Sequence, residues 1–174
     1  LIAGLSAYRW LRNDRTPAVA AAMRVGVVMA MILAPVQIFV GDLHGLNTFK
    51  HQPAKVAAME GIWETERGAA LRLFALPDQN QERNKFEISI PKLSSFILTH
   101  DFDGEVKGLK TWARAERPPV AMVFWTFRIM VGLGMLMIAT GVIALVLHFR
   151  KALFNTRWFH LWCMAMTPAG FIAV

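Results

Sequence analysis

The sequence predicts an all-α membrane protein, a fragment of a transmembrane helix bundle with one long extracytoplasmic loop. The chain of 174 residues is 55% hydrophobic and only 18% charged, whereas a soluble domain is about 45–50% apolar and about 25% charged. The apolar residues are gathered in four blocks, as in membrane proteins. The first and last blocks lie at the chain ends, so we expect an internal piece of one domain of a longer protein.

Two of the apolar blocks are long enough to cross a bilayer. Residues 17–40 would span about 36 Å as a helix, and Arg24 is their only charge, close enough to one end to reach the headgroups. Residues 119–147 form the second complete helix, and their only charge, Arg128, lies deeper in the run.

Partial transmembrane helices are predicted at residues 1–11 and 158–174, and a loop at residues 42–117. The short connectors carry a surplus of positive charge: Arg9, Arg12, Arg15, Arg150, Lys151 and Arg157, against the single acid Asp14. Cytoplasmic connectors carry such a surplus, whereas the loop has 11 acids and 11 bases and is predicted to face outside. Within the loop we expect a short helix at residues 54–64 and a strand at residues 85–90.

The composition and motifs exclude several functions. Although the formal charge is +7, the basic residues lie beside apolar runs or are matched by acids, so nucleic-acid binding is not predicted. Cys163 is the only cysteine and cannot form an intrachain disulfide. The five histidines are scattered, with no HxxxH or CxxC spacing of a metal site.

The stretch FWTFRIMVGLG contains the first candidate site. Arg128 within a membrane helix needs an anionic partner, for which a haem propionate would serve. The Met130 thioether is a soft axial ligand for haem iron, and glycines 132 and 134 would let a flat macrocycle approach. The alternative is that Met130 is one of ten methionines that only pack.

The stretch HQPAKVAAMEGIWETE, residues 51–66, contains the second. Lys55 and Glu60 flank the apolar residues 56–59. An apolar floor with a donor and a proton acceptor beside it would suit hydroquinone oxidation, because losing electrons is coupled to giving protons to a base. The alternative is a solvated amphipathic helix.

These motifs, in this order, resemble subunit I of the cytochrome bd quinol oxidases. The matching segments cover nearly the whole chain: GDLHG at 41–45, QPAKVAAMEGIWETE at 52–66, FALPDQ at 74–79, NKFEISIP at 84–91, VKGLK at 106–110 and FRIM at 127–130.

The resemblance implies a subunit that carries low-spin and high-spin b-type haems and haem d. It implies oxidation of ubiquinol or menaquinol at the outer face of the bacterial inner membrane and reduction of O₂ to water. Lys55, Glu60 and Asp42 match the family's quinol-binding residues, Met130 its axial haem ligand, and Arg128 the arginine beside that haem. Its partners would be a second subunit, a small accessory subunit and membrane lipid.

Other features of that family would lie outside this chain. The histidine partner of Met130 is expected upstream of Leu1, and the GRQPW motif downstream of Val174. The short connection from VKGLK to residue 119 resembles the class with a short quinol loop. Two other functions remain open on the residues alone: a membrane sensor whose ligand binds loop 42–117, and a transporter.

Overall fold

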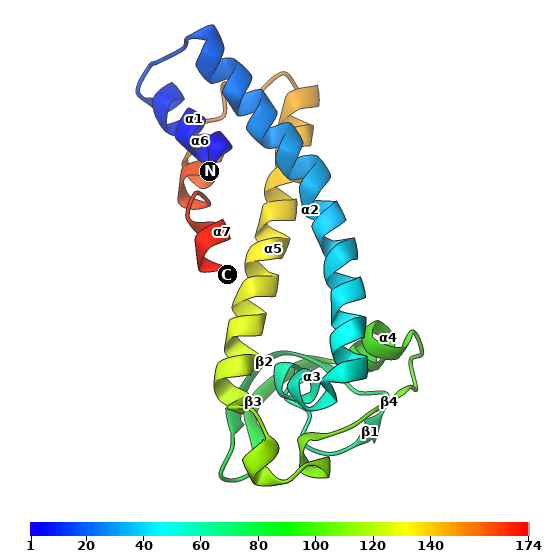
Figure 1. The fold of residues 1–174 in the computed structure, drawn as a ribbon. Helices are drawn as coiled ribbons and strands as arrows, with labels where there is room; N and C mark the ends of the chain where they lie inside the picture. The colour runs from blue at the N-terminus through cyan, green and yellow to red at the C-terminus, as the bar shows by residue number, and fades with distance from the viewer. Residues whose placement is uncertain (174) are drawn as a thin grey trace. The chain divides into compact units, whose positions relative to one another are not determined.

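The computed structural model describes residues 1–173, and these form two compact units (Figure 1). Residues 1–40 and 129–174 make up the first, here called the helical unit. Residues 41–128 make up the second, here called the loop unit. Two long helices, α2 and α5, contribute residues to both.

The helical unit consists of helices alone within the described residues. Its members are α1 (Ile2–Leu11), most of α2 (Pro17–His51) and α5 (Val120–Phe149), α6 (Arg157–Ala165) and α7 (Ala169–Ile172). Both α2 and α5 are long and apolar enough to cross a membrane. The two long apolar helices predicted from the sequence are therefore present, and by length and composition both are candidates to cross a membrane.

Helix α2 is longer than the sequence pattern indicated. It begins at Pro17, as predicted, but continues to His51 instead of ending at residue 40, so the first ten residues of the predicted loop 42–117 are helical. Pro53 explains where it stops: its ring disfavours the helical conformation of Gln52, whose φ and ψ are −135° and 59°. Pro53 then opens the next helix, at a position where its missing N–H is not needed.

The prediction of a single helix at residues 158–174 was wrong. Helix α6 ends at Ala165, and α7 begins only after Pro168. Proline has no N–H to donate to the preceding turn and its ring clashes with that turn, so Pro168 interrupts the helix.

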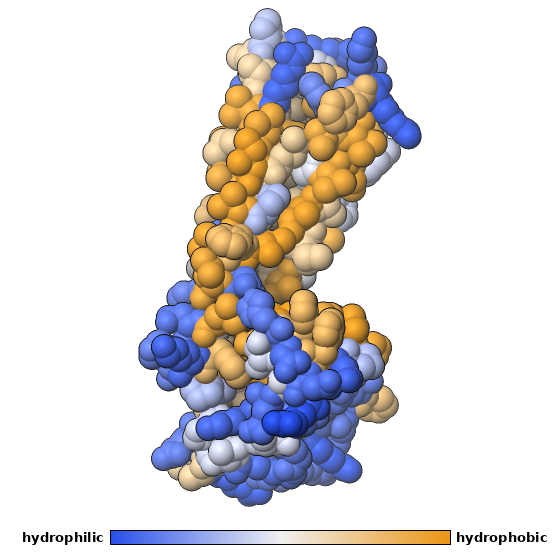
Figure 2. All heavy atoms as spheres, turned by 90° about the vertical axis from the view of Figure 1, so that its right-hand side faces the viewer, coloured by the Kyte–Doolittle hydropathy of each residue, from blue (hydrophilic) through white to orange (hydrophobic). Residues whose placement is uncertain are grey.

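A small apolar core holds the helical unit together, while the long helices expose apolar side chains outward. The buried residues are Ala7, Met23, Val27, Ala144, Leu153, Phe159 and Cys163. The exposed ones on α2 include Val25, Val28, Met29, Ile32, Leu33, Val36, Ile38 and Phe39. Figure 2 shows this hydrophobic surface in orange. Such a surface suits contact with lipid or with other membrane helices.

The loop unit contains strands as well as helices, which corrects the all-α prediction. Strand β2 (Leu71–Asp78) pairs antiparallel with β3 (Arg83–Ile90), and β1 (Glu66–Arg67) pairs with β4 (Glu105–Val106). The predicted strand at residues 85–90 is confirmed as part of β3. Helices α3 (Pro53–Glu60) and α4 (Leu93–Thr99) complete the unit, with 3₁₀ turns at Leu109–Thr111 and Arg114–Glu116.

The turn between β2 and β3 is fixed by charged side chains. The Asp78 carboxylate accepts the N–H groups of Asn80 and Gln81. Hydrogen bonds from Arg117 and Arg114 to Glu82 are 2.8 and 2.7 Å long and hold the pKa of Glu82 below its usual value of 4.5. These bonds join the hairpin turn to the segment that leads into α5.

Helix α3 is shorter than the predicted helix at 54–64. Gly61 ends it in the left-handed conformation, with φ of +66°, which glycine adopts without the steric cost that other residues bear. Ala57 and Ala58 on α3 pack with Trp63, Leu109 and Val120 in the core of the loop unit. One end of α3 is thereby fixed against the start of α5.

Candidate functional site

The central feature of the loop unit is a buried ion pair between the last residue of α3 and helix α5. Glu60 is only 6% exposed, and its Oε2 lies 2.8 Å from Arg128 Nη2. Its Oε1 is 3.4 Å from Arg128 Nη1. The geometry is two-pronged, as expected of a guanidinium that binds a carboxylate, and one carboxylate oxygen is held more loosely than the other.

Arg128 is held on its other sides as well. Its Nε donates to the backbone carbonyl of Arg72 at 2.6 Å, and its guanidinium lies 4.9 Å from the ring centre of Phe124 and 5.4 Å from that of Phe127. We had expected a haem propionate as the anionic partner of Arg128. In this structure the partner is the carboxylate of Glu60, because α3 ends beside this turn of α5.

Further charged residues surround the pair at the level of β2 and β3. The Arg72 side chain lies 3.1 Å from Glu66 and 3.1 Å from Glu87, although its Nε is poorly aligned for a hydrogen bond with Glu87. Asn84 donates to the Gly61 carbonyl at 2.9 Å and to Glu87 at 3.3 Å. None of these residues was predicted as a site residue from the sequence, although Asn84 lies in the NKFEISIP segment.

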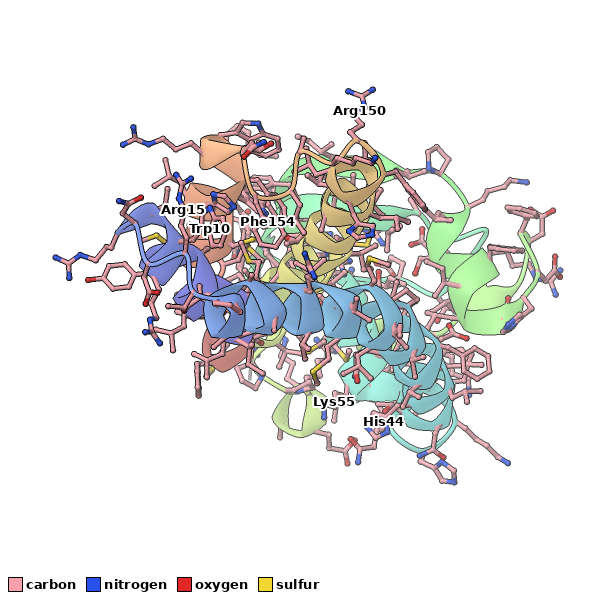
Figure 3. The ribbon with its side chains drawn as sticks, turned by 90° about the horizontal axis from the view of Figure 1, so that it is seen from above. Trp10, Arg15, His44, Lys55, Arg150 and Phe154 are labelled. Carbon is pink, nitrogen blue, oxygen red and sulfur yellow. The ribbon has the colours of Figure 1, made fainter. Side chains whose placement is uncertain are left out.

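Lys55, at the other end of α3, lies in a different environment. Lys55, labelled in Figure 3, is exposed, and it lines a hollow of about 540 Å³ in the loop unit. The other side chains around this hollow are His51, Gln52, Pro53, Ala54, Trp112, Glu116, Arg117, Pro118 and Val123. Polar and apolar groups therefore meet at Lys55, but Glu60 is not among the residues that line the hollow.

The apolar floor predicted between Lys55 and Glu60 is absent as an open surface. Val56, Ala57 and Ala58 are buried in the core of the loop unit. Because α3 is an α-helix, residues five apart point about 140° away from each other. Lys55 therefore faces the hollow while Glu60 faces Arg128.

Asp42 lies within α2 and not in an irregular loop. It is half-buried, and no ion pair to it is formed among the described residues. The structure does not bring Asp42 into the hydrogen-bond network of Glu60.

Met130 lies two residues after Arg128 on α5. Its side chain is 43% exposed, and Gly134, one helical turn later, has no neighbouring atom within 4 Å of where a Cβ would stand. The face of α5 around Met130 is therefore open to a large planar group, and the thioether is a suitable soft ligand for haem iron. In residues 1–173, no group of three or more His, Cys, Asp or Glu side chains could hold a metal ion.

These features define a membrane protein whose compact polar unit holds a buried Glu–Arg pair against a membrane helix. The family of the cytochrome bd terminal oxidase subunit I matches residues 1–174, and the chain belongs to it.

Similar proteins occur in bacteria. The chain is 33% identical to the cytochrome bd ubiquinol oxidase subunit 1 of Bacillus subtilis over 99% of its own length and 39% of that protein. It is 31% identical to the putative cytochrome bd menaquinol oxidase subunit I of the same organism, over 100% and 40% of the two chains. It therefore spans about two fifths of the length of these relatives.

A solved structure has the same fold. The bd oxidase of Geobacillus thermodenitrificans superposes with a TM-score of 0.90 at 27% identity, over 99% of this chain and 40% of that one. The alignment with the cytochrome bd-II ubiquinol oxidase subunit 1 of Escherichia coli extends over 239 residues, at 28% identity and 99% coverage of this chain. Since this chain has 174 residues, that relative has inserted residues which this chain lacks.

Proposed function

We propose that the full-length protein is a bd-type quinol oxidase, which oxidises ubiquinol or menaquinol and reduces O₂ to water. The family membership supports this activity over a sensor or a transporter. For residues 1–174, the observation that best supports this function is the buried pair of Glu60 and Arg128. Both residues lie in the loop unit, and the helix that carries Arg128, α5, continues to Met130.

The quinol head group binds at the hollow beside Lys55. The ring of Trp112 and the side chains of Pro118 and Val123 supply apolar surface, and the Lys55 ammonium donates a hydrogen bond to a quinol oxygen. A neutral quinol gains orientation from such a donor more than charge compensation. Lys55 should therefore contribute mainly to binding, and Asp42 belongs to the surrounding quinol site by its match to the family.

Glu60 is the base that accepts a proton when the quinol is oxidised. Because Glu60 does not line the hollow, the proton would reach it through intervening water or polar groups. Loss of two electrons from a hydroquinone releases two protons and leaves a quinone, so a nearby base favours the reaction. The Oε1 atom has only a 3.4 Å contact with Arg128, so it keeps a lone pair for the proton. Arg128 holds the carboxylate in place and compensates its charge while it is ionised. The proton then leaves toward the outer face.

Met130 would hold a low-spin b-type haem through its sulfur, and this haem would supply one-electron transfer chemistry when bound. The open face beside Gly134 gives a planar macrocycle room at the Met130 sulfur. A high-spin haem b and haem d would be held by other parts of the protein. A second subunit, together with a small accessory subunit and lipid, would complete the complex in the bacterial inner membrane.

The test of the quinol site uses steady-state kinetics of the full-length enzyme. Lys55→Ala should raise the apparent KM for quinol and change kcat little, because the residue contributes to binding. Lys50→Ala is the matched control, since Lys50 is also exposed but does not line the hollow. Unchanged kinetics of Lys55→Ala would contradict a role in quinol binding and leave Lys55 as a solvated residue on the surface of a helix.

The side of the membrane is tested by labelling. Asn80 is exposed in the turn between β2 and β3, and Asn155 is exposed after α5. In a cysteine-free background, a cysteine at position 80 should react with an impermeant thiol reagent in intact cells. A cysteine at position 155 should react only after lysis, and the reverse pattern would invert the proposed topology.

A further inference from the structure

The helical unit carries most of the net positive charge of the chain, because its basic residues are almost unmatched by acids. Its Lys and Arg side chains are Arg9, Arg12, Arg15, Arg24, Arg150, Lys151 and Arg157, and its only carboxyl side chain is that of Asp14. Asp14 is already bound, by Arg9 Nη2 at 2.6 Å and by the N–H of Thr16 at 3.3 Å. The other cations of residues 1–40 and 129–173 form no ion pair with a carboxylate.

Three of these cations line one hollow. It has a volume of about 570 Å³ and lies between the end of α1, the connector that follows and the start of α6. The guanidinium groups are those of Arg12, Arg15 and Arg157, and no acidic side chain lines the hollow. Three positive charges around one open space, without a carboxylate, form a site for an anion.

Aromatic rings contact two of the three arginines, Arg12 and Arg15. The Trp10 indole donates to the Phe154 carbonyl at 3.0 Å, and the Trp10 and Phe154 ring centres are 4.7 Å apart. Arg15 lies over the Trp10 ring at 5.7 Å, and Arg12 over the Tyr8 ring at 5.3 Å. Figure 3 shows Arg15, Trp10 and Phe154 side by side. A guanidinium stacked by its face keeps its N–H edge free to bind an anion.

The floor of the hollow is also fixed. His160 is buried, and its Nε2 donates to the Leu153 carbonyl at 3.0 Å, so the start of α6 is tied to the preceding turn. Leu11, Leu161 and Met164 supply apolar walls beside the guanidinium groups. The hollow thus offers cationic groups for a head group and apolar surface for the chains attached to it.

We propose that this hollow binds the phosphate group of an anionic phospholipid. The N–H groups of the three arginines bind the phosphodiester oxygens, with a geometry that guanidinium and phosphate share. The acyl chains lie along Leu161 and Met164, one of which, Leu161, is 49% exposed. Basic pockets at the ends of membrane helices bind anionic head groups in this way, and the proposal does not depend on the quinol reaction.

The test measures lipid binding to the full-length oxidase complex. The complex is delipidated in detergent, phosphatidylglycerol is added, and bound lipid is counted by native mass spectrometry. Arg15→Gln and Arg157→Gln should each weaken phosphatidylglycerol binding by about fivefold, because each removes one cation. The triple variant, which combines them with Arg12→Gln, should weaken binding by about 100-fold. Arg150→Gln is the matched control. It removes the same charge, but Arg150 points away from the hollow (Figure 3).

Two further arms separate the explanations. Diacylglycerol, which has acyl chains but no phosphate, should bind equally to all variants. The variants should also unfold at the wild-type temperature, which excludes a folding defect. Inorganic phosphate at 100-fold excess should not displace phosphatidylglycerol, because it lacks acyl chains. Equal losses in Arg150→Gln and Arg15→Gln, or displacement by phosphate alone, would overturn the proposal. If the triple variant does not assemble, the single variants decide the matter.

Discussion

The Glu60 carboxylate lies 2.8 Å from the Arg128 guanidinium, although the two residues are 68 positions apart in the sequence. Both side chains are nearly buried, with exposed fractions of 8% for Glu60 and 11% for Arg128. Removing one partner of such a pair leaves an uncompensated charge, at a cost of ~3–5 kcal/mol. Loss of either partner alone should therefore weaken the contact of α3 with α5, besides any chemical role of Glu60.

The predicted haem ligand is tested by Met130→Leu in the full-length protein. Leucine keeps the volume and apolarity of the side chain, so the fold should survive, but it removes the sulfur ligand. The low-spin haem should lose its sixth ligand, its potential should fall, and its reduced absorbance band should broaden or vanish. Met135→Leu is the control, because Met135 is 59% exposed on the same helix. A normal low-spin signal with full haem content in Met130→Leu would assign Met130 to packing.

The end of α3 is tested by Gly61→Ala. Alanine at φ of +66° costs ~1–2 kcal/mol, and its Cβ would lie 3.3 Å from Phe124. The unfolding temperature should therefore fall. Gly45→Ala is the control: Gly45 is helical with nothing within 4 Å of an added Cβ, so alanine should stabilise the helix by ~0.5–1 kcal/mol. Equal effects of the two changes would contradict the left-handed ending of α3.

The pH dependence of stability is tested at Glu82. Its pKa is lowered in the folded protein by hydrogen bonds from Arg117 and Arg114. The contribution to stability is therefore complete above the usual value of 4.5 and is lost as the pH falls below it through the folded pKa. Glu82→Gln should unfold at a lower temperature than wild type at neutral pH, and the difference should shrink in acid. Glu116→Gln, without an ion pair in residues 1–173, should show no such convergence.

The helices were predictable because apolar runs and length decide them. Residues 119–147 were predicted and residues 120–149 are observed. The end of α2 was not predictable from hydropathy, because residues 41–51 are polar enough for a loop and only Pro53 marks the boundary. The strands were underestimated, since only residues 85–90 alternate clearly.

The candidate site was predicted as separate parts. Arg128 was recognised as a membrane cation that needs an anion, and Glu60 as a proton acceptor, but no sequence spacing relates residues so far apart. Their pairing arises because Gly61 turns the chain after α3 and Asn84 holds the Gly61 carbonyl at 2.9 Å. Likewise, the burial of residues 56–58 depends on Trp63, Leu109 and Val120, which lie elsewhere in the sequence.

The most direct test of the account separates the proton-accepting role of Glu60 from its role as the partner of Arg128. Quinol oxidation and dithionite-reduced haem spectra are measured for the full-length Glu60→Ala, Arg128→Ala and double Glu60→Ala/Arg128→Ala enzymes. The double variant has no unpaired buried charge, so it should regain thermal stability relative to Glu60→Ala. Our account predicts that its kcat for quinol nevertheless stays about 100-fold or more below wild type, because the base is gone. Recovery of wild-type kcat in the double variant would contradict the account and leave Glu60 as a structural partner of Arg128.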